Sequence, residues 1–457
     1  MKIADISEKD IGKVYSINAT VKTIKTASGN TLLELRDETG SMKAIAKSHD
    51  ILLGETIEAK VLVSKNNNEI EFEVIGYNKA HKFLIQSETL EMLRTLFIEA
   101  SALIKKAIKE DRPVIIRHHD DTDGYTAGLV IERAIRQIKE KLFMTRSSSK
   151  TPYYDYTDAL RDINTYLFQK KRYGLKSPLV ILCDLGSNRQ SIASIRRIKL
   201  YEAEVLIIDH HHFDLENQEL TLLVNPQVYN QGSEVNSGAL ACEISRLLNP
   251  NITGIKHLPA LSGTADRSSG KDFEAYLKLS GYDKNYLEKW ALAIDHETYY
   301  MKFQESSELL EDLFFPTKNN EKLIEDVSTD IEKDFAKMRE SARKYMKIIE
   351  MKTFKVIMID KSKASNYGEY ASSKIARITH DLMTGPRVTV VETEDSISFR
   401  ADEVPGFSVV NLLNYLQKKM PFALLDGGGH DFAGNIRFNP GSKSEVIEHI
   451  LEYLHKL

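Results

Sequence analysis

The stretch PVIIRHHDDTDGYTAGLVIERAIRQI, residues 113–138, places an apolar run, a polar loop and an amphipathic segment in direct succession. The run has the length of a buried strand, and the apolar residues after the loop have helical spacing. SPLVILCDLGSNRQSIASIRRI at residues 177–198 repeats this order, and AEVLIIDHHHF at residues 203–213 supplies a third strand. Strands that alternate with helices predict a parallel, doubly wound α/β sheet.

Three further regions flank this sheet in the sequence. Residues 1–80 show alternating short strands separated by turns, which predicts a small OB-like β-barrel that binds nucleic acid or protein. The sheet domain is predicted over residues 81–300, and residues 301–350, which are charge-rich and glycine-free, predict a helical connector. A second, smaller α/β pattern predicts a C-terminal domain over residues 351–457.

Composition limits the classes of function that the chain can have. The formal net charge of −4 argues against a globally basic nucleic-acid coat, although the 62 Lys and Arg residues can still cluster on one face. We expect a cytoplasmic protein without a membrane segment, because the sequence has no signal-like stretch and no apolar run of ~20 residues. With only two cysteines, a metal site must rely on histidine and carboxylate, which suit Mn²⁺ or Mg²⁺ and leave zinc possible.

Polar clusters follow three of the predicted strands at the point where each strand ends. These clusters are His119, Asp121 and Asp123 after the first strand, Asp184 after the second, and Asp209, His210, His211 and His212 after the third. Ligands of open α/β sheets bind at the carboxyl ends of the strands, so we expect these groups to meet at one sheet edge. The alternative is a set of unconnected helix-capping aspartates and hydrated histidines.

Carboxylates held so close together repel one another, and a pair of divalent cations would remove that repulsion. Two metal ions ~3.5–4 Å apart form a clamp for phosphoryl displacement. Asp184 comes from the middle segment and is the natural candidate for a ligand shared by both metals. Asp266 lies in ALSGTADRSSG at residues 260–270, and this local sequence alone indicates an ordinary turn. Asp266 becomes a candidate metal ligand only because the other clusters are present.

Near the C-terminus, LLDGGGHDFAGNIRF at residues 424–438 contains Gly427, Gly428 and Gly429 followed by His430. Consecutive glycines let a backbone approach an anion closely, although a tight turn without a ligand is an alternative. Arg400, in ISFRAD, could pair with a phosphate through two hydrogen bonds, or form a surface ion pair.

Together these motifs resemble the DHH phosphoesterases. HHDDTDG, CDLGS, IDHHH and GTADRSSG resemble the four ordered motifs of that superfamily, and GGGHDFAG is similar to the glycine-rich signature of the DHH-associated C-terminal domain. The resemblance spans roughly residues 110–440. With the OB-like region, the layout looks most like that of the archaeal RecJ-type single-strand exonucleases.

The resemblance implies roles for individual residues. One metal would be bound by His119 and Asp121, the other by Asp123, His210 and Asp266, with Asp184 bridging the two. His211 would lie near the scissile phosphate, and Asp209 is expected to orient the imidazoles. With Asp184 and His210, these two residues form the predicted catalytic set. The substrate-binding set that the resemblance implies is Arg400, Gly427, Gly428, Gly429 and His430.

The function implied is a Mn²⁺-dependent exonuclease, with Mg²⁺ possible, that acts on single-stranded DNA or RNA in replication or repair. A phosphodiesterase for dinucleotides or cyclic dinucleotides, and a replisome scaffold bound to the GINS complex and through it to the helicase, are the alternatives. TRSSSKTPYYDY at residues 145–156 has the basic and aromatic composition of a single-strand groove, and equally that of a solvated loop. His118 and His212 fall outside the motif spacing and are expected to be structural, His212 by packing.

Overall fold

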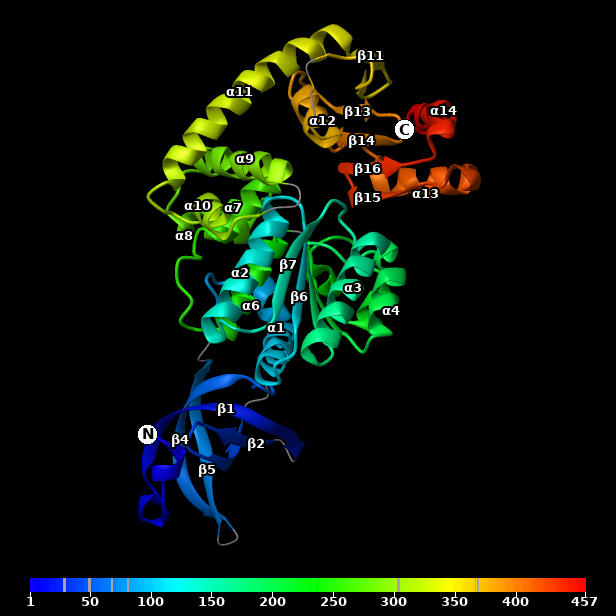
Figure 1. Ribbon diagram of the computed structural model, residues 1–457. Coiled ribbons are helices and arrows are strands. Elements are labelled where there is room, and N and C mark those ends of the chain that lie inside the picture. The colour runs from blue at the N-terminus through cyan, green and yellow to red at the C-terminus, as the bar shows by residue number, and fades with distance from the viewer. Residues whose placement is uncertain are drawn as a thin grey trace. The chain divides into compact units, whose positions relative to one another are not determined.

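The computed structural model describes residues 1–27, 30–47, 51–66, 69–79, 82–232, 234–301, 305–365, 367 and 370–457. The chain divides into two units, Met1–Ala291 and Leu292–Leu457. The first unit contains a closed β-barrel and a parallel sheet, and the second contains a mixed sheet (Figure 1). The domain boundaries expected from the sequence remain predictions. Among the described helices, none is both long and apolar enough to cross a bilayer.

The first strands close into the small OB-like barrel that their alternating sequence predicts. The strands are β1 (Val14–Ala27), β2 (Asn30–Arg36), β3 (Ser41–Ala46), β4 (Thr56–Asn66) and β5 (Glu69–Lys79). Their order is β1-β2-β3-β5-β4, with β4 pairing back onto β1 and β3 running parallel to β5. Ile57, Ala59, Val61 and Val63 of β4 are all buried, because alternate residues of a strand face the same side.

The parallel sheet confirms the predicted doubly wound α/β architecture. Its strands are β6 (Val114–His119), β7 (Met144–Ser149), β8 (Leu179–Cys183), β9 (Glu204–Ile208) and β10 (Leu222–Val224). All neighbouring strands are parallel, in the order β10-β9-β8-β6-β7. The chain thus moves from β6 to β7 on one side and then returns to β8 on the other. This reversal between β6 and β8 is the switch point at which such sheets bind ligands.

Helices cover both faces of the parallel sheet (Figure 1). One face carries α1 (Glu88–Lys109), α2 (Thr122–Ile138) and α6 (Ser237–Leu248), and the other carries α3 (Tyr156–Tyr173) and α4 (Ile192–Lys199). The remaining helices of this part of the chain are α5 (Leu215–Leu220), α7 (Leu258–Ala265), α8 (Lys271–Ser280) and α9 (Lys284–Met301). Asp121 begins α2 by accepting a hydrogen bond from the Gly124 amide at 2.9 Å, and Asp155 caps α3 in the same way.

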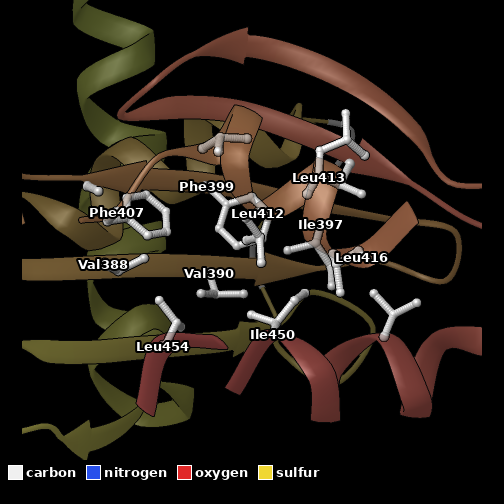
Figure 2. Close-up of a cluster of buried hydrophobic side chains, with 14 of the residues drawn as sticks. Val388, Val390, Ile397, Phe399, Phe407, Leu412, Leu413, Leu416, Ile450 and Leu454 are labelled. Carbon is white, nitrogen blue, oxygen red and sulfur yellow. The ribbon is translucent and has the colours of Figure 1, made fainter. Parts of the chain in front are cut away.

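The second unit is built on a six-stranded mixed sheet. The strand order is β11 (Lys347–Glu350), β12 (Lys355–Asp360), β13 (Arg387–Glu392), β14 (Ser396–Ala401), β16 (Ala433–Arg437) and β15 (Asp426–His430). Its helices are α10 (Ser307–Phe314), α11 (Asn320–Tyr345), α12 (Ser372–His380), α13 (Val409–Lys419) and α14 (Lys443–His455). Figure 2 shows Val388, Val390, Ile397 and Phe399 of the sheet packed with side chains of α13 and α14 in one apolar core.

A buried ion pair fixes β6 against α3. Alternation along β6 turns Arg117 towards α3, where its guanidinium donates to both oxygens of Asp162 and lies 3.5 Å from Asp158 Oδ1. The Tyr154 hydroxyl donates to Asp162 Oδ2 at 2.9 Å. All four side chains are buried. Ions buried in this way are tolerated only when they are paired and hydrogen-bonded, so the pair also holds the strand that carries His119.

We predict that Arg117→Met lowers the free energy of unfolding by about 3–5 kcal/mol, because two buried carboxylates lose their cation. Urea unfolding at pH 7 measures the loss. The matched control is Arg136→Met, since Arg136 makes a surface pair with Glu132 at 2.8 Å and should cost less than about 1 kcal/mol. Equal losses in the two variants would contradict a stabilising role for the buried pair.

Candidate active site

The predicted strand-end residues converge at the switch point of the parallel sheet. His119 ends β6, Asp184 directly follows β8, and His210 lies two residues after β9. Three groups have ligand atoms that all lie within 4.8 Å of one another: His119, Asp121 and Asp184; Asp184, His210 and His211; and Asp123, His210 and Asp266. All seven residues that the sequence predicted to bind a metal or to lie near the scissile phosphate therefore belong to one cluster.

Asp184 lies between two sets of donor atoms and faces each with a different oxygen. Its Oδ2 lies 3.4 Å from His119 Nδ1, and its Oδ1 lies 3.4 Å from His210 Nε2. The residue has a φ of +59°, a left-handed conformation that is unfavourable for a residue with a side chain. A hydrogen bond from its amide to the Ile208 carbonyl, 2.8 Å long, holds this conformation between β8 and β9. Backbone strain at such a point is typical of a functional residue.

Two buried atoms of the cluster that could ligate a metal, an imidazole nitrogen and a carboxylate oxygen, lie close to other ligand atoms. His119 Nδ1 lies 2.7 Å from Asp121 Oδ2, and Asp266 Oδ2 lies 3.4 Å from His210 Nε2. Neither His119 Nδ1 nor Asp266 Oδ2 makes a hydrogen bond within the described part of the chain. Buried polar atoms are normally satisfied, so their grouping indicates an additional partner. Imidazole and carboxylate donors fit a divalent metal ion.

Proximity and burial shift the ionisation of the carboxylates. Burial raises the pKa of Asp123 well above its ordinary value, and the charges of Asp266 and Asp184 raise it further. Burial also raises the pKa of Asp266 to about 7, against the opposing effect of His210. Burial alone would raise the pKa of Asp184, but the adjacent imidazoles of His119 and His210 hold it well below its ordinary value. The cluster is therefore short of positive charge at Asp123 and Asp266.

Asp209 orients the two histidines that follow it. Its Oδ1 accepts hydrogen bonds from the amides of His210 and His211, at 2.8 and 3.2 Å, and contacts His211 Nδ1 at 2.8 Å. Its Oδ2 accepts from the Ser187 amide at 3.1 Å. Burial alone would lower the pKa of His211, but the charge and hydrogen bond of Asp209 raise it to about 9.

The N-terminus of α6 contributes residues that the sequence reasoning did not identify. The amides of Ser237 and Gly238 donate to the two oxygens of Asp123 at 3.1 and 2.7 Å, and the Ser237 hydroxyl donates to Asp184 Oδ1 at 3.0 Å. A Cβ on Gly238 would lie 2.8 Å from Asp123 Oδ1, so this position has no room for a side chain. The helix-start signal Asn-Ser-Gly at residues 236–238 could have marked the segment, but not its contact with the aspartates.

The structure contradicts two expectations, stacking by Tyr153 and Tyr154 and packing of His212. Tyr153 and Tyr154 are buried, so they form no stacking platform, and Tyr154 instead belongs to the ion pair beneath the sheet. His212 is exposed rather than packed. His118 is buried and accepts a hydrogen bond at Nε2 from Arg146 at 2.9 Å, with its Nδ1 placed 2.8 Å from the His119 carbonyl. Burial, together with Arg146, lowers the pKa of His118 well below its ordinary value.

The predicted substrate-binding residues lie together in the sheet of the second unit. Gly427, Gly428 and Gly429 belong to strand β15 rather than to a turn. Arg400 pairs with Ala433, and Ala433 pairs with His430, so the three residues share one row across β14, β16 and β15. The side chain of His430 lies outside the described set. Gly429 has a φ of +130°, and a Cβ there would lie 2.4 Å from the Ala433 carbonyl oxygen. Only glycine fits that position.

Comparison with known proteins places the chain in a family. The model of the DHH family, N-terminal domain, matches residues 113–253. A solved structure described as the DHH domain of a member of a ribosomal-protein family is 32% identical, with a TM-score of 0.78, over 82% of this chain and 94% of that one. The chain belongs to the DHH family, as its motifs predicted.

Two further relatives extend the comparison. An uncharacterized protein of Methanocaldococcus jannaschii is 30% identical over 429 residues; the match covers 82% of this chain and 56% of the relative's length. The crystal structure of RecJ in complex with Mn²⁺ from Thermus thermophilus has a TM-score of 0.57 at 14% identity, and covers 83% of this chain and 56% of that one. This last likeness is one of fold alone, and it confirms the RecJ-like DHH fold.

We predict that Ser237→Ala weakens Mn²⁺ binding about tenfold, because groups that orient metal ligands typically contribute at least that factor to affinity. Isothermal titration calorimetry on the whole chain measures the affinity without reference to activity. Ser245→Ala is the matched control, since Ser245 lies in the same helix and its buried hydroxyl makes no hydrogen bond to any described residue. An unchanged affinity in Ser237→Ala would show that this hydroxyl does not position Asp184.

Proposed function

We propose that the chain hydrolyses phosphodiester bonds of single-stranded nucleic acid, using two divalent metal ions held at the candidate active site. The observation that carries this proposal is the position of Asp184, whose two oxygens face His119 on one side and His210 on the other. A carboxylate so placed can serve two ions at once. The DHH family membership supports phosphoester hydrolysis as the chemistry.

Each residue of the cluster has a proposed role in holding the metals. His119 and Asp121 would bind one ion, Asp123, His210 and Asp266 would bind the other, and Asp184 would be shared. The ions would polarise the phosphoryl oxygens and balance charge as the phosphodiester is cleaved. Asp123 and Asp266, which burial disfavours as anions, would become fully ionised beside a cation.

His211 is the proposed contact to the scissile phosphate. The hydrogen bond between its Nδ1 and Asp209 fixes the orientation of the ring. The charge and hydrogen bond of Asp209 raise the pKa of His211, which favours the protonated imidazole. A protonated imidazole at this position would offer both a positive charge and a hydrogen-bond donor to a phosphate oxygen.

Recognition of the nucleotide next to the cleaved bond is proposed for the second unit. The backbone of Gly427–Gly429 presents a strand without side chains, which a phosphate or sugar can approach closely. Arg400, in the same row of the sheet as His430, would pair with a phosphate through its guanidinium. Preference for Mn²⁺, a place in replication or repair, a location in the cytoplasm, and association with GINS and the helicase belong to the same proposal, and the sequence resemblance alone supports them.

The decisive experiment is a cleavage assay on the whole purified chain. With Mn²⁺, labelled single-stranded 30-mers of DNA and RNA should be shortened from one end while duplex stays intact. Asp184→Asn should lower the rate about 100- to 1,000-fold or more, because the shared ligand is lost from both metals. Asp155→Asn is the matched control, since asparagine caps α3 as well as aspartate does and the rate should be unchanged.

The outcome of this assay separates the competing functions. Intact oligonucleotides under all metal conditions, with Asp184→Asn behaving like the unaltered chain, would overturn the nuclease proposal. Faster turnover of a dinucleotide or cyclic dinucleotide than of the 30-mer would instead assign the chain to the small-molecule phosphodiesterases. Labels at the two ends give the polarity of degradation in the same measurement.

A further inference from the structure

Helix α3 exposes a stripe of apolar side chains in addition to those that it packs against the sheet. Its inner side packs Ala159, Ile163 and Tyr166 against the sheet. Along the flank of this buried side, Tyr156, Leu160 and Leu167 are 49%, 38% and 36% exposed, and Phe168, further round the helix, is 67% exposed. The first three fall within about 40° of arc around the helix, since each residue turns the helix by about 100°. The stripe therefore runs along one line for most of the length of α3.

The exposed charged side chains of α3 are all cations. The exposed charged residues of α3, which is described throughout, are Arg161, Lys170, Lys171 and Arg172. Both acidic residues that lie within α3, Asp158 and Asp162, are buried at the sheet with Arg117. The neighbouring helix α4 adds Arg197, whose guanidinium lies 5.6 Å from the centre of the Tyr156 ring. An apolar line bordered by cations, without an exposed carboxylate on the helix, is complementary to an acidic amphipathic surface.

We propose that the outer face of α3, defined by Tyr156, Leu160, Leu167 and Phe168, binds an acidic amphipathic helix of a partner protein. Apolar residues at helical spacing are what such a helix recognises, and acidic side chains at its borders would pair with the cations of α3. Leucines at two of the four positions favour protein over nucleic acid, because single strands use aromatic rings for stacking and gain little from aliphatic side chains. The surface is separate from the candidate metal ligands and does not depend on the proposed activity.

The test uses a fluorescein-labelled 18-residue peptide with leucines at positions i, i+4, i+7 and i+11 and glutamates beside them. Fluorescence anisotropy with the whole chain should show saturable binding that weakens as salt rises. Leu160→Asp/Phe168→Asp should weaken binding at least tenfold, since the two substitutions place charge on the apolar surface. Met92→Asp is the matched control: Met92 is 48% exposed on α1, at the opposite face of the sheet, and its variant should bind normally.

Each other outcome overturns the proposal. Absence of peptide binding, or equal weakening by Met92→Asp, would show that the outer face of α3 is no docking surface. If a peptide with lysine in place of glutamate binds as tightly as the acidic peptide, the cations of α3 do not select an acidic partner. If the double variant instead loses binding to a 30-nucleotide oligo(dT), the face belongs to nucleic acid. If the unaltered chain is a dimer in analytical ultracentrifugation and the double variant is a monomer, the face joins two copies of this chain.

Discussion

Repulsion among buried carboxylates is the constraint on which the candidate site depends. Asp121, Asp123, Asp184 and Asp266 come from three separate segments of the first unit and meet at one edge of a parallel sheet. Burial makes the anions of Asp123 and Asp266 costly, and the negative charges nearby add to that cost. Such a cluster persists only if the surrounding structure supplies positive charge, hydrogen-bond donors or both.

The fold supplies part of this compensation from its backbone. The first amides of α6 bind Asp123 at the end of the helix that carries partial positive charge, and the imidazoles of His119 and His210 flank Asp184. The compensation is incomplete, as the raised pKa values of Asp123 and Asp266 show. Divalent cations would supply the missing charge.

The sequence predicted the metal-ligand candidates at the strand ends because a parallel sheet brings the residues that follow its strands to one edge. Residues that follow strands of one parallel sheet must lie at one edge, so Asp184 and His210 could be placed together from alternation of strands and helices alone. Strand order does not predict the positions of Ser237 and Gly238, which begin helix α6 in a later part of the chain. Tyr154 was misplaced for a related reason: its burial depends on Arg117 and Asp162, a pairing that the local sequence does not show. The glycines of β15 looked like a turn because glycine-rich sequence cannot distinguish a turn from a strand that passes close to its neighbour.

The same alternation that builds the site also determines which surfaces remain for other partners. Along β6, His118 faces α2, whereas Arg117 faces α3 and draws Asp158 and Asp162 inward. Because both acidic residues of α3 are held in this buried pair, the exposed charged side chains of the helix are all cations. The electrostatic character of that surface thus follows from a structural requirement of the strand that ends in His119. A substitution that relieved the buried pair would alter both the anchoring of the site and the charge of the face proposed for docking.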